Sequence, residues 1–342
     1  IGRIAGDVEI ASGATLSPGH GGPGTLTVGG NLTLQANSAT SFELGQAGVV
    51  GGASNDLVSV RGNLTLGGAL TANAASAGWY RLFNYDGSLS GSFASTQVNS
   101  TQSGFTPRSH SLDTGTTGQI NLSVVAAGQS LQFWNGGQTS GNGSIAGGAG
   151  TWSLAGTNWT DSAGTATQGW NGSVAVFGGS AGGNVAVAGA QSFDTLQFST
   201  NGYNLTGGSL AFSPASGTQG TINTDAGISA AIATTLVDGS GTSLLKVGGG
   251  TLTLSGVNTY SGGTTVAEGT LVAASNNALG AGAVTVDNTA GRNAILQINS
   301  GVTLANTVTL THGGGLNNAG TLAGNLLMDT SSANRVQLQA GS

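Results

Sequence analysis

Short strand-like units of one composition recur along the 342-residue chain and limit the folds open to it. They read Gly-Thr-Leu or Asn-Leu-Thr-Leu, as in residues 24–28, 31–34, 63–66, 250–254 and 320–322. Apolar residues alternate with Thr in these units, which is the period-two pattern of a strand with one buried and one solvated face. Related positions lie six residues apart within a group, and Thr251 and Thr270 lie nineteen apart. The units therefore form an array of short strands with a period of about twenty residues.

This spacing predicts an all-β solenoid in place of a sheet of hairpins. Hairpin strands are usually about 5 to 6 residues long and are joined by recognisable two-residue turns, whereas these units are shorter. A chain that turns after about six residues and returns above itself after about twenty forms a parallel β-helix, with Leu, Val and Ile stacked inside. Gly and Asn stand at many of the breaks because they tolerate positive φ most readily. At about 20 to 22 residues per coil, we expect roughly 15 to 17 coils.

The charge pattern excludes several partners. Charged residues make up only 6% of the chain, and its 7 basic residues are spread singly from Arg3 to Arg335. They cannot form the positive stripe that a phosphate backbone requires, so nucleic acid is not an expected partner. The chain has no Cys, which excludes a thiolate metal site and a thiol nucleophile. No apolar stretch approaches the ~18 residues of a membrane helix, and no signal peptide follows Ile1, so we expect a mature or excised piece of a protein.

Two stretches depart from the repeated pattern and suggest a division of the chain. One is aromatic, at residues 78–87, and a polar run follows it. The other, at residues 133–179, holds four of the five Trp. We therefore divide the chain near residue 126. Residues 1–125 form an N-terminal β-helix segment, and residues 126–342 hold the Trp-rich stretch and a C-terminal β-helix.

Several blocks of the sequence resemble bacterial autotransporter passengers. The blocks at residues 16–32 and 55–66 look like the opening of many such passengers, and the Trp-rich stretch is similar to one that is widespread in them. The most specific block resembles the passenger-associated transport repeat, the autotransporter β-strand repeat. It lies at about residues 248–280, and its matching segments are residues 248–256, 258–266, 268–271 and 278–280.

The resemblance implies a passenger of a type V secretion system, folded as a right-handed parallel β-helix and exposed on the cell surface or secreted through the outer membrane. Such passengers are followed by an outer-membrane β-barrel. Residues up to Ser342 contain no such barrel, so it is an expected partner outside this chain.

The favoured function is a rigid extracellular rod that presents the passenger and supports its own secretion. Coils added in succession from the C-terminal side would bury apolar surface and oppose backsliding of the chain. Residues 248–280 would be the platform on which this addition starts. The expected stacking residues of this repeat are Leu252, Leu254, Tyr260, Val266 and Leu271.

Catalysis is not expected, because the Asp residues are scattered singly along the chain. Lyases and hydrolases built on β-helices gather several Asp with Arg, Lys or His on one face of the rod. Two spacings place charged residues about one coil apart, namely Glu268 with Asp287 and Asp225 with Lys246, and neither pair gathers a third charged group. We therefore assign no catalytic, cofactor-binding or metal-binding residue, and we expect that the chain is not an enzyme.

The Trp-rich stretch allows two interpretations. Exposed indoles can stack on the apolar faces of sugar rings and form a glycan-binding surface, whereas buried indoles fill or cap a wide coil that Gly and Ala cannot fill. We favour the structural role. Glycan stacking is the alternative for Trp134, Trp152, Trp159 and Trp170.

Adhesion is a second class of function for this chain. Long faces of Thr, Asn and Ser can hydrogen-bond to host or neighbouring-cell molecules, or to a second rod in a biofilm. An adhesin or self-association surface is therefore the alternative to the structural rod. The sequence names no host ligand, cleavage site or oligomeric state.

Overall fold

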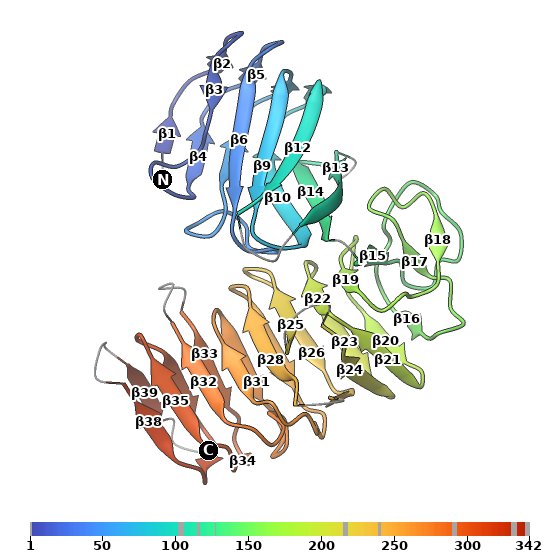
Figure 1. Ribbon diagram of the computed structural model, residues 1–342, viewed down its shortest axis with the longest axis vertical. Coiled ribbons are helices and arrows are strands. Elements are labelled where there is room, and N and C mark those ends of the chain that lie inside the picture. Colours follow the sequence, from blue (N-terminus) through green and yellow to red (C-terminus); the bar gives the residue numbers. More distant parts are fainter. Residues whose placement is uncertain are drawn as a thin grey trace. The chain divides into compact units, whose positions relative to one another are not determined.

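The computed structural model describes residues 2–101, 106–114, 117–126, 128–214, 218–238, 241–288, 293–329 and 334–338 (Figure 1). The regular elements in these residues are all β-strands. The chain divides into two compact units, Ile1–Gln129 and Ser130–Ser342. Most neighbouring strands in each unit pair in parallel, coil upon coil, which confirms the predicted parallel β-helix.

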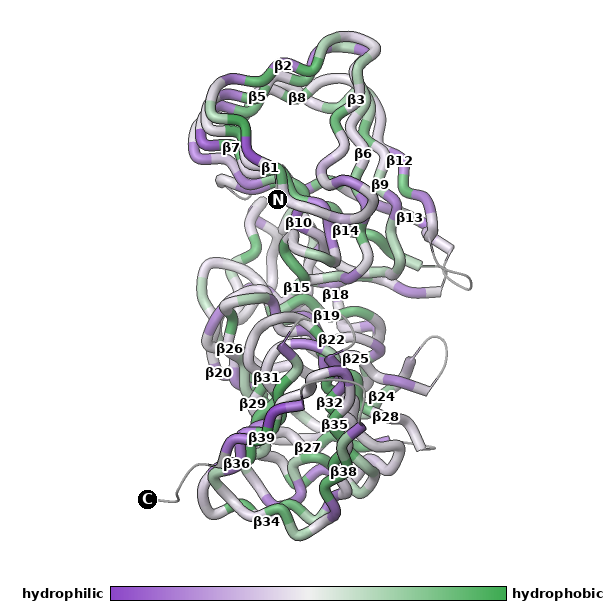
Figure 2. Tube along the Cα trace, turned by 90° about the vertical axis from the view of Figure 1, so that its left-hand side faces the viewer, coloured by the Kyte–Doolittle hydropathy of each residue, from purple (hydrophilic) through white to green (hydrophobic). Residues whose placement is uncertain are grey.

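Three sheets form the sides of the first unit, and Figure 2 views this unit along its stack, so that successive coils superpose as a ring. The first sheet runs in the order β1 (Gly2–Ile4), β4 (Thr25–Val28), β7 (Leu57–Val60), β10 (Gly78–Tyr85), β14 (Gln119–Ala126) and β13 (Pro107–Asp113). The second contains β2 (Val8–Ile10), β5 (Leu32–Leu34), β8 (Leu64–Leu66) and β11 (Leu89–Gly91). The third contains β3 (Thr15–Leu16), β6 (Ala39–Leu44), β9 (Ala69–Ala74) and β12 (Ser95–Ser100).

Inward side chains of the first unit stack directly on one another. On the first sheet Val28 pairs with Val60, and Val60 pairs with Tyr85. On the second sheet Leu32 pairs with Leu64. All five side chains are buried. The alternation of Leu or Val with Thr therefore places each apolar side chain against its equivalent in the next coil, as period-two patterning requires.

One corner of the first unit is held by a ladder of side-chain oxygens. Asp7 Oδ1 accepts a hydrogen bond from Asn31 N at 2.7 Å, Asn31 Oδ1 accepts one from Asn63 N at 2.8 Å, and Asn63 Oδ1 accepts one from Ser88 N at 2.9 Å. Each bond joins one coil to the next. Gly62 stands beside this ladder, and a Cβ on it would lie 2.6 Å from Asn31 Oδ1. The Gly-Asn pair at residues 62–63 is therefore a steric requirement of the corner.

The parallel stacking of the first unit ends at its last strands. β10 pairs antiparallel with β14 from Gly78 to Asn84, with a shift of register between Arg81 and Phe83, and β14 pairs antiparallel with β13. Phe83 and Asn84 pair with β14 on one edge of β10 and with β7, in parallel, on the other. Antiparallel strands offer no equivalent position for a further coil, so they close this unit.

Asp56 ties two coils of the first unit from a buried position. Its Oδ1 accepts a hydrogen bond from Gly24 N at 2.7 Å and its Oδ2 accepts one from Glu43 N at 2.8 Å. Burial raises the pKa of Asp56 to about 6, against the lowering effect of these two hydrogen bonds, and the nearby Glu43 charge adds to the rise. The carboxyl group thus stays partly protonated at pH values where an exposed Asp is ionised.

Two long sheets and two short ones form the second unit (Figure 1). The first long sheet contains β18 (Thr167–Gln168), β17 (Trp159–Thr160), β15 (Leu131–Trp134), β19 (Val174–Phe177), β22 (Thr195–Phe198), β25 (Gln219–Thr224), β28 (Ser243–Val247), β30 (Thr264–Val266), β32 (Val284–Asp287), β35 (Val308–Thr311) and β38 (Leu326–Met328). The second contains β16 (Gly150–Trp152), β20 (Asn184–Val187), β23 (Tyr203–Thr206), β26 (Ser229–Ile232), β29 (Thr251–Leu254), β31 (Thr270–Ala273), β33 (Ile295–Ile298), β36 (Gly315–Asn318) and β39 (Arg335–Leu338). The short sheets contain β21 (Ala190–Phe193), β24 (Ser209–Phe212) and β27 (Thr235–Val237), and β34 (Thr303–Leu304) with β37 (Thr321–Leu322).

The described residues make fewer coils than the sequence spacing predicts. Parallel pairing along the first sheet gives four levels in the first unit, from β1 to β10, and nine in the second, from β15 to β38. The reason is that many coils are longer than 20 to 22 residues. Val28 and its partner Val60 are 32 residues apart, and Leu131 and its partner Val174 are 43 apart. Loops between strands lengthen these coils without changing the register of the strands.

We predict that Gly62→Ala destabilises the first unit by about 2 kcal/mol or more, because the added Cβ collides with Asn31 Oδ1 and with the Gly30 backbone. Gly6→Ala is the matched control, since nothing lies within 4 Å of a Cβ there. The control should stay within about 0.5 kcal/mol of the parent. Hydrogen exchange of peptides covering residues 25–66 measures both effects, and equal protection in the two variants would contradict the steric argument.

We predict that the free energy of unfolding of the first unit falls as the pH rises from 4 to 6. The pKa of Asp56 lies near 3.9 in the unfolded chain and at about 6 in the folded one. The folded state therefore binds more protons between these values, and its advantage is lost as the pH rises through 6. The free energy of unfolding is measured by urea denaturation at several pH values, with hydrogen exchange of residues 25–66 as the readout. Its slope against pH is the quantity to compare. Asp56→Asn should remove it, and an unchanged slope in that variant would assign the effect to other groups.

Candidate functional site

The strands of the expected transport repeat lie in the middle of the second unit and stack in register with their neighbours. Leu252 of β29 pairs with Ala230 of β26 on one side and with Leu271 of β31 on the other. Leu254 pairs in the same way with Ile232 and Ala273. These side chains are buried. The repeat therefore continues the core column of the coils before and after it.

Tyr260 fills the corner between β29 and β30. Its side chain is buried, and its hydroxyl lies 2.7 Å from Thr264 Oγ1. Its ring packs edge-on against Phe212, with 5.4 Å between the ring centroids. Burial raises the pKa of the Tyr260 hydroxyl, so it remains a neutral hydrogen-bonding group. Val266 follows at the end of β30 and is buried between Lys246 and Val286.

Asn258 joins the same corner to its neighbours on both sides. Its Oδ1 accepts a hydrogen bond from Leu236 N at 2.8 Å, and its Nδ2 donates one to Ala278 O at 2.6 Å. Leu236 belongs to the preceding coil and Ala278 to the following one. The Asn-Thr-Tyr segment thus supplies an amide that bridges three levels of the stack and an aromatic ring that fills the corner.

Lys246, the only lysine of the chain, occupies an inward position in β28. It pairs with Ile222 on one side and with Val266 on the other, in the column of buried apolar side chains. The side chain is fully buried. Its Nζ donates hydrogen bonds to the carbonyl oxygens of Val247 at 2.8 Å, Gly248 at 2.7 Å and Glu268 at 3.0 Å. All three N–H donors of the ammonium group are thereby satisfied.

Two buried carboxylates act on this lysine, which corrects the expectation that the Asp225 and Lys246 pair gathers no third charged group. Asp225 follows β25 in the preceding coil and Glu268 follows β30 in the next coil, and both are buried. Burial lowers the pKa of Lys246 to about 7, against the raising effect of Glu268 and then of Asp225. The spacing of Asp225 and Lys246 was visible in the sequence. The spacing pairs Glu268 with Asp287, and its proximity to Lys246 was missed because the sequence does not show that the corner after β30 reaches Lys246.

The four Trp of the second unit form one aromatic cluster at its first level. Trp134, Trp152 and Trp159 come from β15, β16 and β17, and Trp170 follows β18. The Trp159 ring lies 5.2 Å from that of Trp134 and 5.1 Å from that of Trp152, both edge-on, and Trp152 lies 5.2 Å from Trp170. β17 pairs antiparallel with β15 and with β18. The cluster therefore fills the end of the parallel stack, as a capping segment does.

The indoles of this cluster are buried, so they do not offer the exposed flat faces that stacking on a sugar ring requires. Trp134 Nε1 donates a hydrogen bond to Gly148 O at 2.8 Å, and Trp170 Nε1 donates one to Ser192 O at 2.7 Å. Both bonds hold the rings against loops of the same cap. This geometry favours the structural role over the glycan-stacking alternative for Trp134, Trp152, Trp159 and Trp170.

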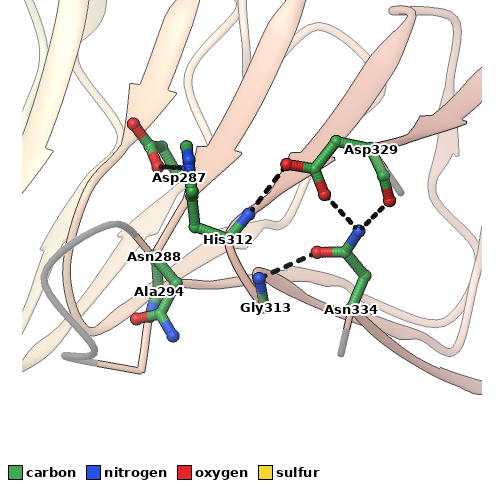
Figure 3. A network of polar contacts seen from close by, with 7 residues as sticks. All are labelled: Asp287, Asn288, Ala294, His312, Gly313, Asp329 and Asn334. Atoms are coloured by element: carbon green, nitrogen blue, oxygen red, sulfur yellow. Dashed lines mark hydrogen bonds and ion pairs between the residues drawn. The ribbon is translucent and has the colours of Figure 1, made fainter. Parts of the chain in front are cut away.

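Polar residues stack at one corner of the last coils (Figure 3). His312 Nδ1 lies 2.9 Å from Asp287 Oδ1, and His312 N donates a hydrogen bond to Asp329 Oδ2 at 3.2 Å. Asn334 Nδ2 donates to Asp329 Oδ1 at 2.9 Å, and Asn334 Oδ1 accepts a hydrogen bond from Gly313 N. The His312 side chain is about half exposed, so its attraction to Asp287 is screened by solvent. This network links three successive corners.

Neither metal ligation nor a membrane-spanning helix is found in the described part of the chain. No group of three or more His, Cys, Asp or Glu side chains there is arranged to hold a metal ion. Within the same ranges, no helix has the length and apolarity that crossing a membrane requires.

We predict that the free energy of unfolding of the second unit rises as the pH increases from 7 to 9. The pKa of Lys246 is about 7 when folded and about 10.4 when unfolded, so the unfolded state binds more protons over this range. Urea denaturation followed by Trp fluorescence reports this unit, which holds four of the five Trp. Lys246→Met should abolish the rise. Leu244→Met, at an inward position of the same strand, is the matched control and should keep it.

Comparison with known proteins gives two matches. The family described as Passenger-associated-transport-repeat matches residues 244–273. The adhesin BmaC autotransporter of Brucella suis biovar 1 (strain 1330) is 36% identical over 311 residues, which covers 82% of this chain and 8% of that protein. The chain thus spans about 8% of the length of this curated relative. No solved structure matches the chain.

The matched repeat coincides with the corner described above. Residues 244–273 run from the second residue of β28 to the end of β31 and contain Lys246, Leu252, Tyr260 and Glu268. The relative, which is described as an autotransporter, extends the likeness over most of the chain, and this likeness assigns the chain to the cell surface or to the secreted proteins. A β-helical stack, the transport repeat within it and this relative lead to one conclusion: the chain belongs to the bacterial autotransporter passengers that carry the passenger-associated transport repeat.

Proposed function

We propose that this chain is a structural segment of a passenger, a stiff extracellular rod that presents other parts of the protein and supports its own secretion. The observation that carries the proposal is the continuous inward column of the second unit. Residues Leu196, Ile222, Lys246, Val266, Val286 and Leu310 pair in sequence and are all buried. A stack of this kind yields stiffness along its axis, and we propose that the chain has no enzymatic role.

The proposed contribution to secretion is physical. Each coil that folds outside the cell buries apolar side chains on the coil before it, so the exported chain cannot slide back without exposing them to water. The transport repeat would be the platform for this addition, through Leu252, Leu254, Tyr260, Val266 and Leu271. The partner of the chain in this process is the translocator domain of its own passenger protein.

Adhesion is the second candidate function, and the name of the relative favours it. BmaC is described as an adhesin. The outward face of the first long sheet carries a column of threonines interrupted by one leucine, namely Thr195, Thr221, Leu245, Thr265, Thr285 and Thr309. Such a column offers hydroxyl groups at the strand spacing of about 4.8 Å. We propose it as the surface for contact with host molecules, neighbouring cells or a second rod.

We predict that Leu252→Asp sharply lowers the amount of the passenger on the cell surface. The substitution places a carboxylate at a fully buried position of the repeat, where it has no partner. Thr253→Asp is the matched control on the outward side of the same strand and should leave display near the parental level. Antibody labelling of intact cells, compared with total protein, measures the effect. Deleting residues 248–280 should act like Leu252→Asp, and unchanged display after that deletion would refute the platform role.

We predict that charge on the threonine column disperses cells that aggregate through this chain. Thr265→Lys, Thr285→Lys and Thr309→Lys together place three like charges on adjacent coils, which repel the same surface on a second rod. Thr253→Lys with Gln297→Lys on the other long sheet is the control. Settling of cell suspensions measures aggregation. Equal settling of the triple variant and the parent would remove this column as the contact surface.

A further inference from the structure

The hydrogen-bond partners of Lys246 are distributed unequally over the stack. Two of its three acceptors belong to its own coil: the carbonyl oxygen of Val247, the last residue of β28, and that of Gly248, the first residue after the strand. The third, Glu268 O, lies in the corner after β30, one coil toward the C-terminus. The side chain therefore reaches from its own coil into the next one.

The charged groups around Lys246 show the same asymmetry. Asp225 faces it from the preceding coil and Glu268 from the following coil. Of the two carboxylates, that of Glu268 has the larger effect on the pKa of Lys246. The backbone carbonyl oxygen of Glu268 also accepts the third hydrogen bond of the lysine. On its C-terminal side the lysine thus has both a hydrogen bond and a carboxylate, whereas on its N-terminal side it has a carboxylate alone.

This asymmetry makes the two orders of coil addition unequal. When the coil of β28 packs onto an already folded β30, the ammonium group enters the core with its three acceptors and its stronger carboxylate in place. When it packs first onto β25, the Glu268 acceptor is missing, and the third N–H donor stays bonded to water that the coil of β30 must later displace. Burying a charged group without its partners is costly. Addition toward the N-terminus avoids this cost.

The lysine is not explained by core packing. Its neighbours in the column are Ile222 and Val266, so an apolar side chain would fill the position, and apolar replacements of buried ionic groups are often neutral or stabilising. Buried polar groups are instead known to fix register in some proteins. A slip of β28 by one residue would turn Lys246 outward and Leu245 inward.

We propose that Lys246 acts as a lock between two coils of the transport repeat: its ammonium group closes the coil of β28 onto the coil of β30 and so directs the addition of coils toward the N-terminus. The proposal rests on the proposed function, in which folding proceeds from the C-terminal side. It assigns a specific role to Lys246 and Glu268, with Asp225 joining after the lock has closed.

The test is a refolding experiment on the purified full chain. Refolding from urea is interrupted at successive times by a short pulse of an amine-reactive ester, and mass spectrometry of the peptide that carries Lys246 measures how fast this single lysine becomes protected. Glu268→Gln removes the charge on the C-terminal side and leaves the backbone carbonyl in place. Asp225→Asn is the matched change on the N-terminal side.

The lock predicts different kinetics for the two variants. Glu268→Gln should slow the protection of Lys246 by about fivefold, because its interaction forms before the coil closes. Asp225→Asn should leave that rate within about twofold and instead speed unfolding, because its interaction forms later. Equal slowing in both variants, or slowing in Asp225→Asn alone, would overturn the proposal.

A second measurement keeps the test valid if one of the two variants refolds poorly. In a Lys246→Met background, followed by Trp fluorescence, Glu268→Gln should no longer change the refolding rate, because its partner is gone. An undiminished effect there would place the role of Glu268 outside the lock. Display of the passenger on cells is measured separately from these rates. If the repeat is needed for display but the two variants refold alike, the proposed function stands and the lock is rejected.

Discussion

The stacking of each inward side chain on its equivalent in the next coil is the constraint on which the rest of this structure depends. A single coil of this chain cannot bury its own Leu and Val side chains, because the strands are only two to eight residues long. Its core exists only where a neighbouring coil covers it, as with Leu252 beneath Leu271. Stability is therefore a sum of contacts between adjacent coils. The end of a stack is closed in a different way: antiparallel strands β13 and β14 close the last level of the first unit, and the Trp cluster around β15 covers the first level of the second.

The same constraint explains which parts of the molecule the sequence predicts well. Alternation of Leu with Thr at residues 31–34 and 63–66 is enough to predict inward and outward faces, because burial follows the period of the strand. The structure pairs Leu32 with Leu64 accordingly. The number of coils is predicted poorly, since the period shows in strands and not in loops. The loop that holds Asn55 and Asp56 lengthens one coil to 32 residues without disturbing the pairing of Val28 with Val60.

In the transport repeat, too, some features can be predicted from the sequence and others cannot. Strand parity places Lys246 on the face of Leu244, so its burial follows from the sequence. Its hydrogen-bond acceptors cannot be predicted from the sequence. They are the backbone carbonyls of Val247, Gly248 and Glu268, and every residue has such a carbonyl. Which carbonyls converge on the ammonium group depends on the path of two corners. The Trp residues have a similar limit: their sequence fits both an exposed and a buried cluster, and only the structure shows that the indoles are buried.

Because its coils are similar, this chain can misfold by stacking the same coils at the wrong level or in the wrong register. Apolar columns alone do not exclude it, because Leu, Val and Ile are nearly interchangeable partners at every level. A residue that occurs at one level only does exclude it, since its partners exist at one place in the stack. Lys246 meets this condition, because it is the only lysine of the chain and its acceptors lie in two particular corners. In the first unit the buried carboxyl group of Asp56 also has specific partners, since it joins Gly24 to Glu43. Buried polar groups in such a stack therefore specify the level and register of each coil, which the uniform apolar columns do not.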